Sequence, residues 1–262
     1  MKAIVINGYK SFVGKNFYNL FKKKYKFFQY KEDINDIEKF KDYTKSKNFD
    51  YFVHFAGLSR YKCDLKKKLC VKTNFNSVKK IINHLNTLKK RPTFIFISSS
   101  HVYDFSTEKL KESAKKNPKS LYAELKLKTE YYIKKNYKKY CILRLFNIYG
   151  KDQPQSFFVP DMVKKIKNNQ IINISKSSRD FINVNEVSNV IDFIISKEIN
   201  TTLNVGTGKG ITLLSIINKI SKKLSIKPLI KINDKSDKLI ADISTLKSFG
   251  YIRKYNEKNF NI

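Results

Sequence analysis

Apolar runs of strand length alternate with longer amphipathic stretches through the first 150 residues, and no other feature constrains the fold as strongly. The predicted strands are residues 3–7, 27–30, 51–55, 93–98 and 140–145. The predicted helices are residues 14–24, 34–47, 69–88 and 120–138. Strands separated by helices in this way form parallel sheets with right-handed crossovers. We therefore predict an α/β fold, a doubly wound parallel sheet of Rossmann type.

The length of the chain leaves room for a second, smaller unit. A chain of 262 residues with 41% hydrophobic content can form one large α/β domain with a small lobe attached. Residues 1–150 are predicted to form the sheet domain, which the chain rejoins at about residues 179–200. Residues 151–262 are predicted to form mainly a small C-terminal lobe.

The three cysteines, Cys63, Cys70 and Cys141, show neither C-x-x-C spacing nor the His/Cys spacing of metal sites. We expect three free thiols, with Cys141 packed within a strand, and no metal. The chain starts directly with a strand-like segment and contains no run of about 18 or more apolar residues. These features favour a cytoplasmic protein without a membrane partner.

The formal net charge of +32 suggests a nucleic-acid partner at first sight. The lysine clusters, however, are spread along the chain instead of forming one basic tail with interleaved aromatic residues. Lys, Asn, Ile, Phe and Tyr are all abundant, as expected of an AT-rich genome. We interpret much of the lysine as solvated surface and expect no nucleic-acid partner. The positive field would still attract an anionic substrate such as a nucleotide diphosphate.

Gly8, Ser11 and Gly14 form a G-x-x-S-x-x-G pattern between the first predicted strand and the first predicted helix. The first glycine permits a tight turn, Gly14 lets the helix pack closely on the strand, and the helix N-terminus offers N–H groups to a pyrophosphate. Ser11 stands where dinucleotide-binding turns usually carry a middle glycine. Ordinary strand-to-helix turns also contain two glycines, so this pattern gains weight only from the rest of the chain.

Tyr122 and Lys126 lie four residues apart in a predicted helix, downstream of a serine run at 98–100 that ends a predicted strand. Residues at i and i+4 share one helix face, so the ammonium is expected beside the phenol. A neighbouring positive charge favours the phenolate and would let Tyr122 exchange a proton near neutral pH. Ser99 would give the same substrate oxygen a second hydrogen bond. Taken alone, the pair also fits an ordinary basic helix.

Seven further segments follow one another in a characteristic order: VHFAG at 53–57, TNFN at 73–76, ISSSHVY at 97–103, PKSLY at 118–122, RLFNIYG at 144–150, RDFINV at 179–184 and LNVGTG at 203–208. Together with the glycine turn and Lys126, they resemble the extended short-chain dehydrogenase/reductase family, in its sugar-nucleotide epimerase, dehydratase and reductase branch. The resemblance covers nearly the whole chain. Several ordered motifs are far more specific than any one of them.

The resemblance implies a nicotinamide enzyme that acts on a nucleoside-diphosphate sugar held by the C-terminal lobe. Tyr122 is similar to the family's catalytic acid/base, and Ser99 to the Ser/Thr that binds the reacting oxygen. Lys126 is similar to the residue that holds the nicotinamide ribose and lowers the tyrosine pKa. The implied cofactor contacts are Gly8, Ser11, Phe12, Val13, Gly14, Lys31, Ala56, Gly57 and Lys126.

The implied substrate contacts are Ser99, His101, Asn147 and Arg179. Asn147 matches a position that lies against the diphosphate. Arg179 matches one that pairs with it, because a guanidinium fork suits phosphate oxygens. A surface salt bridge between Arg179 and Asp180 is the alternative interpretation. His101 is either an additional acid/base or, as we favour, a polar wall of the pocket.

Lys31 stands at the end of the second predicted strand, where an acidic residue commonly binds the adenosine ribose of NAD. A cation there favours the 2′-phosphate of NADP slightly over NAD. Glu32 and Asp33 follow immediately, and a shift of one residue reverses this assignment.

The family's dehydratases carry an acidic pair just after the catalytic Ser/Thr, where this chain has Ser100 and His101. Dehydration is therefore disfavoured. Reduction of a 4-keto sugar nucleotide, for surface-polysaccharide synthesis, is slightly favoured over 4-epimerisation with tightly bound NAD. An alternative of another class is a non-catalytic Rossmann-fold regulator or RNA-binding protein, although the Ser/Tyr/Lys set is intact. A homodimer through the helices at 69–88 and 120–138 is usual for the family and expected here.

Overall fold

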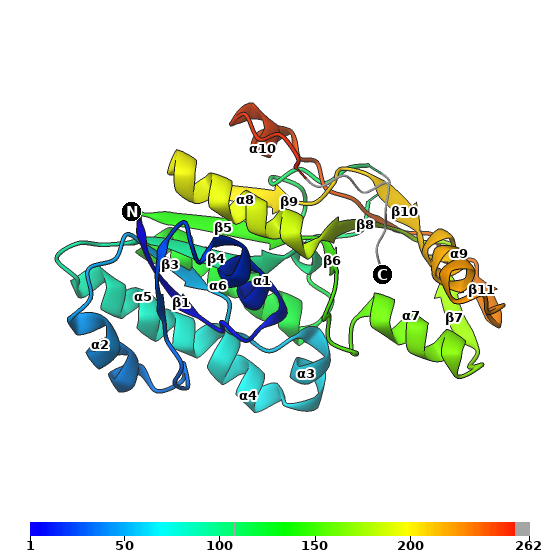
Figure 1. The fold of residues 1–262 in the computed structure, drawn as a ribbon, viewed down its shortest axis with the longest axis horizontal. Helices are drawn as coiled ribbons and strands as arrows, with labels where there is room; N and C mark the ends of the chain where they lie inside the picture. Colours follow the sequence, from blue (N-terminus) through cyan, green and yellow to red (C-terminus); the bar gives the residue numbers. More distant parts are fainter. Residues whose placement is uncertain (107, 255–262) are drawn as a thin grey trace.

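A parallel sheet of six strands forms the centre of the molecule in the computed structural model, which describes residues 1–106 and 108–254 (Figure 1). The strands follow the order β2-β1-β3-β4-β5-β9, and every neighbouring pair is parallel. Their bounds are β1 (Ala3–Asn7), β2 (Lys26–Gln29), β3 (Tyr51–His54), β4 (Thr93–Ser99), β5 (Tyr140–Leu145) and β9 (Thr202–Val205). The predicted doubly wound parallel sheet is confirmed.

Helices cover both faces of this sheet, which explains why its strands are apolar on both sides. One face packs against α1 (Phe12–Phe21) and α8 (Val184–Lys197). The other face packs against α2 (Ile37–Lys45), α5 (Ser77–Thr87) and α6 (Leu121–Asn136). Alternate side chains of β1 show the division, since Ile4 and Ile6 face α1 and α8 whereas Val5 faces the opposite layer.

The strand order reverses between β1 and β3. The chain leaves β1 for β2 on one side and then returns to β3 on the other side. At such a switch point, the loops after the two strands part and leave a crevice at the carboxyl ends, where ligands bind in open α/β sheets. The glycine turn after β1 and the segment after β3 therefore border the expected ligand crevice.

A smaller lobe follows β5 and lies beyond one end of the large sheet (Figure 1). In it β6 (Asn147–Tyr149), β10 (Gly210–Thr212) and β12 (Lys238–Leu239) pair around β8 (Ser178–Asn183). A second pair, β7 (Ile172–Ser175) and β11 (Ile230–Asn233), packs with α7 (Phe158–Lys167) and α9 (Leu213–Leu224) around one apolar cluster. The chain returns to the large sheet through α8 and β9, and α10 (Ser244–Ser248) lies beside β9.

The expectation of three free thiols is wrong for two of them, because Cys63 and Cys70 form a disulfide. Two short helices, α3 (Arg60–Leu65) and α4 (Lys67–Val71), meet at Lys66 and bring the two Cα atoms to 5.0 Å, within bridging range. Two cysteines seven residues apart do not by themselves indicate a disulfide, and the break between the two helices was not predicted from the sequence. Cys141 is free and buried in β5, as expected.

The predicted helix at 69–88 is divided into α4, a π-helical turn η1 (Lys72–Asn76) and α5.

Among the described residues, no helix combines the length and the apolar character needed to cross a membrane. No group of three or more His, Cys, Asp or Glu side chains within 1–106 and 108–254 has the arrangement of a metal site.

Candidate active site

The glycine turn after β1 requires its first glycine. Gly8 has a φ of +60°, and a Cβ atom there would lie 2.5 Å from the backbone nitrogen of Ala56. A Cβ atom on Gly14 would lie 2.6 Å from the carbonyl oxygen of Gly8. The two glycines thus let the turn, the helix α1 and the segment after β3 approach one another closely, as the sequence pattern predicted.

Ser11, in the place of the middle glycine, has a structural task of its own. It is the N-cap of α1, and its Oγ accepts a hydrogen bond from the backbone nitrogen of Gly14 at 3.2 Å. Phe12 and Val13 form the first turn of that helix. Their position leaves the N-terminus of α1 at the crevice, where its partial positive charge favours an anion.

Asn7, which the sequence reasoning did not single out, joins the two sides of the crevice. Its buried Oδ1 accepts hydrogen bonds from the backbone nitrogens of Phe55 at 3.0 Å and Ala56 at 3.2 Å. Its Nδ2 lies 2.8 Å from Nδ1 of His54. A buried asparagine at the end of an apolar strand was the available signal, because such a side chain must find partners.

Gly57 and Asn74 form the wall that continues towards α6. The Asn74 side chain accepts from the backbone nitrogen of Leu58 at 2.7 Å and donates to the carbonyl oxygen of Leu58 at 3.0 Å. A Cβ atom on Gly57 would lie 3.2 Å from Asn74 Oδ1 and 4.0 Å from Lys126 Nζ. Gly57 therefore keeps open the space in front of Lys126.

The structure brings Ser99 and Tyr122 together, from the end of β4 and the first turn of α6. Burial raises the pKa of Tyr122, and a hydrogen bond with the Ser99 hydroxyl acts in the opposite direction. Ser99 is also the N-cap of the short helix η2 (Ser100–Val102), where its Oγ accepts from the backbone nitrogen of His101 at 3.2 Å. Ser99 thus interacts with the phenol, whereas the Ser98 hydroxyl bonds Glu130; the role of Ser99 towards a substrate stays a prediction.

Lys126 lies behind this pair, with its side chain buried. Its Nζ donates to the carbonyl oxygen of Ile97 at 2.6 Å and lies 5.8 Å from the centre of the Tyr122 ring. Burial lowers the pKa of Lys126 to about 8, and the Glu130 carboxylate opposes this shift. Burial of the phenol raises the pKa of Tyr122 in this structure, and the lowering of that pKa by Lys126 stays a prediction.

His101 lies beside Tyr122, with its ring centre 6.4 Å from that of the phenol. Burial lowers the pKa of His101 to about 4, and the positive charges of Arg60 and Arg179 add to this shift. The imidazole is therefore neutral at pH 7. Arg60, at the start of α3, was absent from the predicted site residues, since an exposed arginine in a basic chain gives no signal.

Arg179 in β8 is already paired with a carboxylate, but not with that of its neighbour Asp180. Its Nη2 lies 2.6 Å from Oδ1 of Asp237, and its Nη1 donates to the carbonyl oxygens of Ser178 and Asp237. The guanidinium also lies 5.2 Å from the centre of the Phe105 ring. The alternative interpretation of an Arg179–Asp180 salt bridge is therefore wrong.

The Asp180 side chain instead points into the lobe, where it forms hydrogen bonds with the segment after β9. Its carboxylate accepts from the backbone nitrogens of Thr207 at 2.8 Å, Gly208 at 2.9 Å and Ala241 at 3.2 Å. Asn147 lies on the neighbouring strand β6 and donates from Nδ2 to the carbonyl oxygen of Asp180 at 3.2 Å. Asn147 and Arg179 thus occur on adjacent strands of the lobe.

Lys31 follows β2 with its side chain exposed, as do Glu32 and Asp33. One oxygen of Asp33 accepts hydrogen bonds from both the backbone and the side-chain nitrogen of Asn35, each at 2.9 Å. This local turn ties the Asp33 side chain to its own loop and leaves Lys31 extending from the end of the strand.

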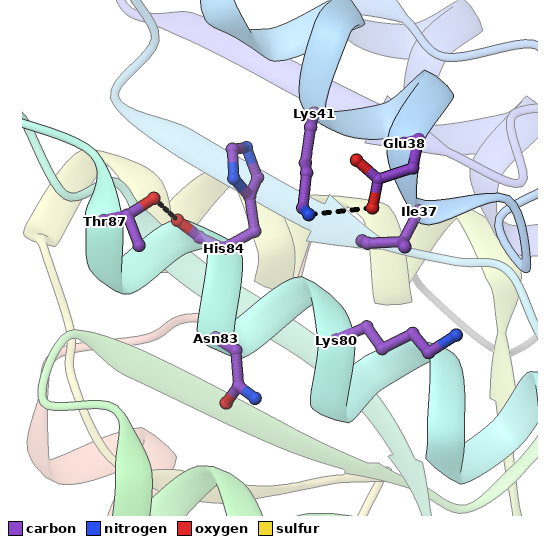
Figure 2. Close-up of a pocket in the computed structure, with 7 residues that line it drawn as sticks. All are labelled: Ile37, Glu38, Lys41, Lys80, Asn83, His84 and Thr87. Atoms are coloured by element: carbon purple, nitrogen blue, oxygen red, sulfur yellow. Dashed lines mark hydrogen bonds and ion pairs between the residues drawn. The ribbon is translucent and has the colours of Figure 1, made fainter.

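A hollow of about 660 Å³ lies elsewhere, between α2 and α5 (Figure 2). Lys41 pairs with Glu38 at 2.8 Å there, and the hydroxyl of Thr87 donates to the carbonyl oxygen of His84. None of its lining residues belongs to the predicted catalytic, cofactor or substrate sets. The hollow therefore does not alter the location of the candidate site at the carboxyl ends of the strands.

A comparison with known protein families identifies the family of this chain. The NAD dependent epimerase/dehydratase family matches residues 4–206. The chain belongs to this family. The match confirms the resemblance predicted from the ordered motifs, and it makes the chain a member of a family of enzymes.

Similar proteins include one curated relative and two solved structures of this family's fold. The GDP-6-deoxy-D-talose 4-dehydrogenase of Aggregatibacter actinomycetemcomitans is 28% identical over 232 residues, which are 81% of this chain and 77% of that protein. The UDP-N-acetylglucosamine 4-epimerase of Methanobrevibacter ruminantium, in complex with UDP-N-acetylmuramic acid, is 25% identical with a TM-score of 0.82, covering 98% and 94% of the two chains. The UDP-glucose 4-epimerase of Thermus thermophilus, in complex with NAD, is 16% identical with a TM-score of 0.83, covering 97% and 94%.

The residues present fit the nicotinamide dinucleotide that this family uses. The N-terminus of α1 faces the crevice at a turn that only glycine permits at Gly8, which suits a pyrophosphate. Gly57 leaves open space in front of the buried ammonium of Lys126. Tyr122, which interacts with Ser99, lies beside Lys126, with its ring centre 5.8 Å from Lys126 Nζ.

Proposed function

We propose that this protein is an NAD(P)-dependent enzyme that reduces the 4-keto group of a nucleoside-diphosphate sugar. The observation that carries the proposal is the interaction of the Ser99 hydroxyl with the Tyr122 phenol beside the buried Lys126, at the carboxyl end of β4. This set of side chains offers a carbonyl oxygen two hydroxyl groups and a proton, with a cation behind them.

In the proposed reaction Ser99 and Tyr122 donate hydrogen bonds to the carbonyl oxygen, and Tyr122 releases its proton to it. A nicotinamide dinucleotide held at the glycine turn and Lys126 would supply the hydride for the carbonyl carbon. Lys126 would hold the nicotinamide ribose and stabilise the phenolate that Tyr122 becomes. The neutral His101 would line the pocket without carrying charge at pH 7. Asn147 and Arg179 would contact the diphosphate.

Two observations favour reduction over the other reactions of the family. Ser100 and His101 occupy the positions after Ser99, so the acidic pair of a dehydratase is missing there. The curated relative that matches most of this chain is by name a 4-dehydrogenase of a GDP-6-deoxyhexose. A 4-epimerase with tightly bound NAD is the alternative, supported by the likeness to a UDP-N-acetylglucosamine 4-epimerase.

The preference between NADP and NAD, the location, the assembly and the product are proposed mainly from the sequence. NADP is slightly favoured over NAD, because the exposed Lys31 extends from β2 while Asp33 is engaged within its own loop. The expected location is the cytoplasm and the expected assembly a homodimer. The expected product is a building block for a surface polysaccharide.

The first test is to identify any cofactor that copurifies by mass spectrometry, and then to assay GDP-, CDP-, UDP- and dTDP-linked 4-keto-6-deoxy sugars with NADH and NADPH. Stoichiometric consumption of exchangeable NADPH or NADH supports the reductase. Tightly retained NAD with interconversion of two sugar nucleotides would replace it with the epimerase.

Tyr122→Phe should lower kcat at least a thousandfold while cofactor binding persists, because the variant lacks the transferable proton. Tyr131→Phe is the matched control, since Tyr131 lies on the same helix with 58% of its surface exposed. Activity retained in Tyr122→Phe would contradict the assignment. Steeply salt-dependent binding to generic RNA, with no turnover of any sugar nucleotide, would favour the non-catalytic alternative instead.

A further inference from the structure

A fully buried ion pair lies one helical turn beyond the candidate catalytic lysine. Nη2 of Arg144 in β5 lies 2.6 Å from Oε2 of Glu130 in α6, and Nε lies 3.1 Å from both carboxylate oxygens. The two side chains are only 2% and 1% exposed. Burying two charges costs several kcal/mol per ion before their attraction is counted, so such a pair requires good geometry and further hydrogen bonds.

Those further hydrogen bonds are present. The Ser98 hydroxyl donates to Oε1 of Glu130. Nη1 of Arg144 donates to the hydroxyl of Tyr103 at 2.7 Å and to the carbonyl oxygen of Glu112 at 2.8 Å. The Tyr103 hydroxyl in turn donates to Oδ1 of Asn204 at 2.6 Å. The network therefore joins α6 to three neighbouring strands, β4, β5 and β9.

The position of Glu130 relates this network to the candidate active site. Glu130 follows Lys126 by four residues and Tyr122 by eight, so all three lie on one face of α6. On the strand side, Ser98 immediately precedes Ser99. The carboxylate therefore fixes the helix that carries Tyr122 and Lys126 against the strand that carries Ser99.

The charge of Glu130 also bears on Lys126. Lys126 is buried. The groups around it include the Tyr122 phenol and Glu130 from α6, the Ile97 carbonyl oxygen and the Phe96 ring from β4, and His54 from β3. Burial lowers the pKa of His54 to about 3, so it is neutral. The Glu130 carboxylate therefore favours the charged form of Lys126.

Glu130 has cations of its own around it. Arg144 pairs with it directly from β5, while Lys116 and Lys134 lie within electrostatic range. Burial lowers the pKa of both lysines.

We propose that Glu130 is a positioning residue for the catalytic pair: held by Arg144 and Ser98, it sets the register of α6 against β4 and maintains the positive charge on Lys126. This inference rests on the proposed function, in which Lys126 contacts the dinucleotide and Tyr122 the substrate. It adds a residue that touches neither ligand.

The test is the pH dependence of NADH and NADPH binding to Glu130→Gln, followed by fluorescence between pH 6 and pH 10. Because the carboxylate favours protonated Lys126, its removal should move the alkaline loss of binding to lower pH by about one unit. For any substrate that the wild type reduces, kcat should fall by about ten- to a hundredfold while KM changes little.

Asp192→Asn is the matched control. Asp192 is a buried carboxylate on α8 that accepts from the Tyr25 hydroxyl at 2.6 Å, and α8 covers the face of the sheet opposite to α6 and Lys126. Asp192→Asn should lose dinucleotide binding at the same alkaline pH as the wild type. If dinucleotide binding is lost at the same alkaline pH in wild type, Glu130→Gln and Asp192→Asn, the inference is overturned, whatever the stability of the variants.

Ser98→Ala keeps the test decisive where Glu130→Gln folds poorly. It removes the hydrogen bond to the strand and leaves the Glu130 charge, so kcat should fall without a shift of the alkaline limb. An unchanged kcat in Ser98→Ala overturns the register part of the inference. Failure of the wild type to bind either dinucleotide would overturn the proposed function as well, whereas normal binding with coincident limbs overturns this inference alone.

Discussion

At the scale of single residues, Arg179 is already paired with a carboxylate of its own chain, Asp237. A diphosphate that pairs with Arg179 would therefore compete with this carboxylate for the guanidinium. We expect Asp237→Asn to lower the KM for the sugar nucleotide by about three- to tenfold, because a partly exposed ion pair contributes about 0.5–1.5 kcal/mol. Steady-state kinetics measures this. Asp234→Asn is the control, since Asp234 pairs with Lys176 in the same segment; an equal effect of both variants would contradict the prediction.

His54 makes a residue-scale prediction about pH. Burial lowers the pKa of His54 to about 3, whereas an unfolded histidine titrates near 6.5. The stabilisation is therefore fully present above pH 6.5 and is lost as the pH falls, because the unfolded chain binds the proton first. This group alone should cost about 2 kcal/mol of unfolding free energy between pH 7 and pH 5.

Urea unfolding of wild type and His54→Asn at pH 7, 6 and 5 isolates this contribution. His101 titrates in the same window and is present in both proteins, so it cancels in the difference. The variant should lose less stability on acidification than the wild type. Parallel pH dependence in the two proteins would show that His54 does not remain neutral in the folded state.

At the scale of secondary-structure elements, the sequence predicted the apolar strands of the large sheet. The bounds of β1 and β5 agree with the predicted 3–7 and 140–145, because both strands are buried on two faces. The strands of the lobe have no such signal. β10 has three residues and β11 alternates apolar with exposed polar side chains, so their pairing depends on contacts that sequence periodicity does not contain.

The candidate site divides in the same way. The i, i+4 spacing placed Tyr122 and Lys126 on one helix face, and the serine run placed Ser99 beside them. The partners that tertiary structure supplies were not predictable: Asp237 for Arg179, and Arg144 for Glu130. Each of these pairs joins segments that are separated in the sequence, and no local pattern specifies which charge meets which.

The disulfide between α3 and α4 gives an element-scale prediction. The Cys63–Cys70 bond closes a short loop and should stabilise the fold by about 2–3 kcal/mol relative to the reduced protein. Alkylation in denaturant followed by mass spectrometry should label one thiol, Cys141, without reductant and three after reduction. Three labelled thiols in the untreated protein would show that the bond does not form under those conditions, as is usual in the cytoplasm.

At the scale of the whole molecule, the exposed apolar side chains indicate where a second copy would bind. Tyr61, Leu65, Leu69 and Tyr131 are exposed on α3, α4 and α6, three helices that contact one another. Large apolar side chains gathered on adjoining helices are typical of an interface. This surface includes parts of both helices through which the homodimer was expected from the sequence.

We expect Tyr131→Asp to convert the proposed dimer into a monomer, because a charge buried in an apolar interface is desolvated without a partner. Light scattering coupled to gel filtration measures the mass directly. Leu229→Asp is the matched control, since Leu229 is 52% exposed but lies in the lobe before β11. A dimer that survives Tyr131→Asp, or one that Leu229→Asp dissociates, would place the interface elsewhere. A monomer that keeps its turnover would further show that each active site is complete within one chain.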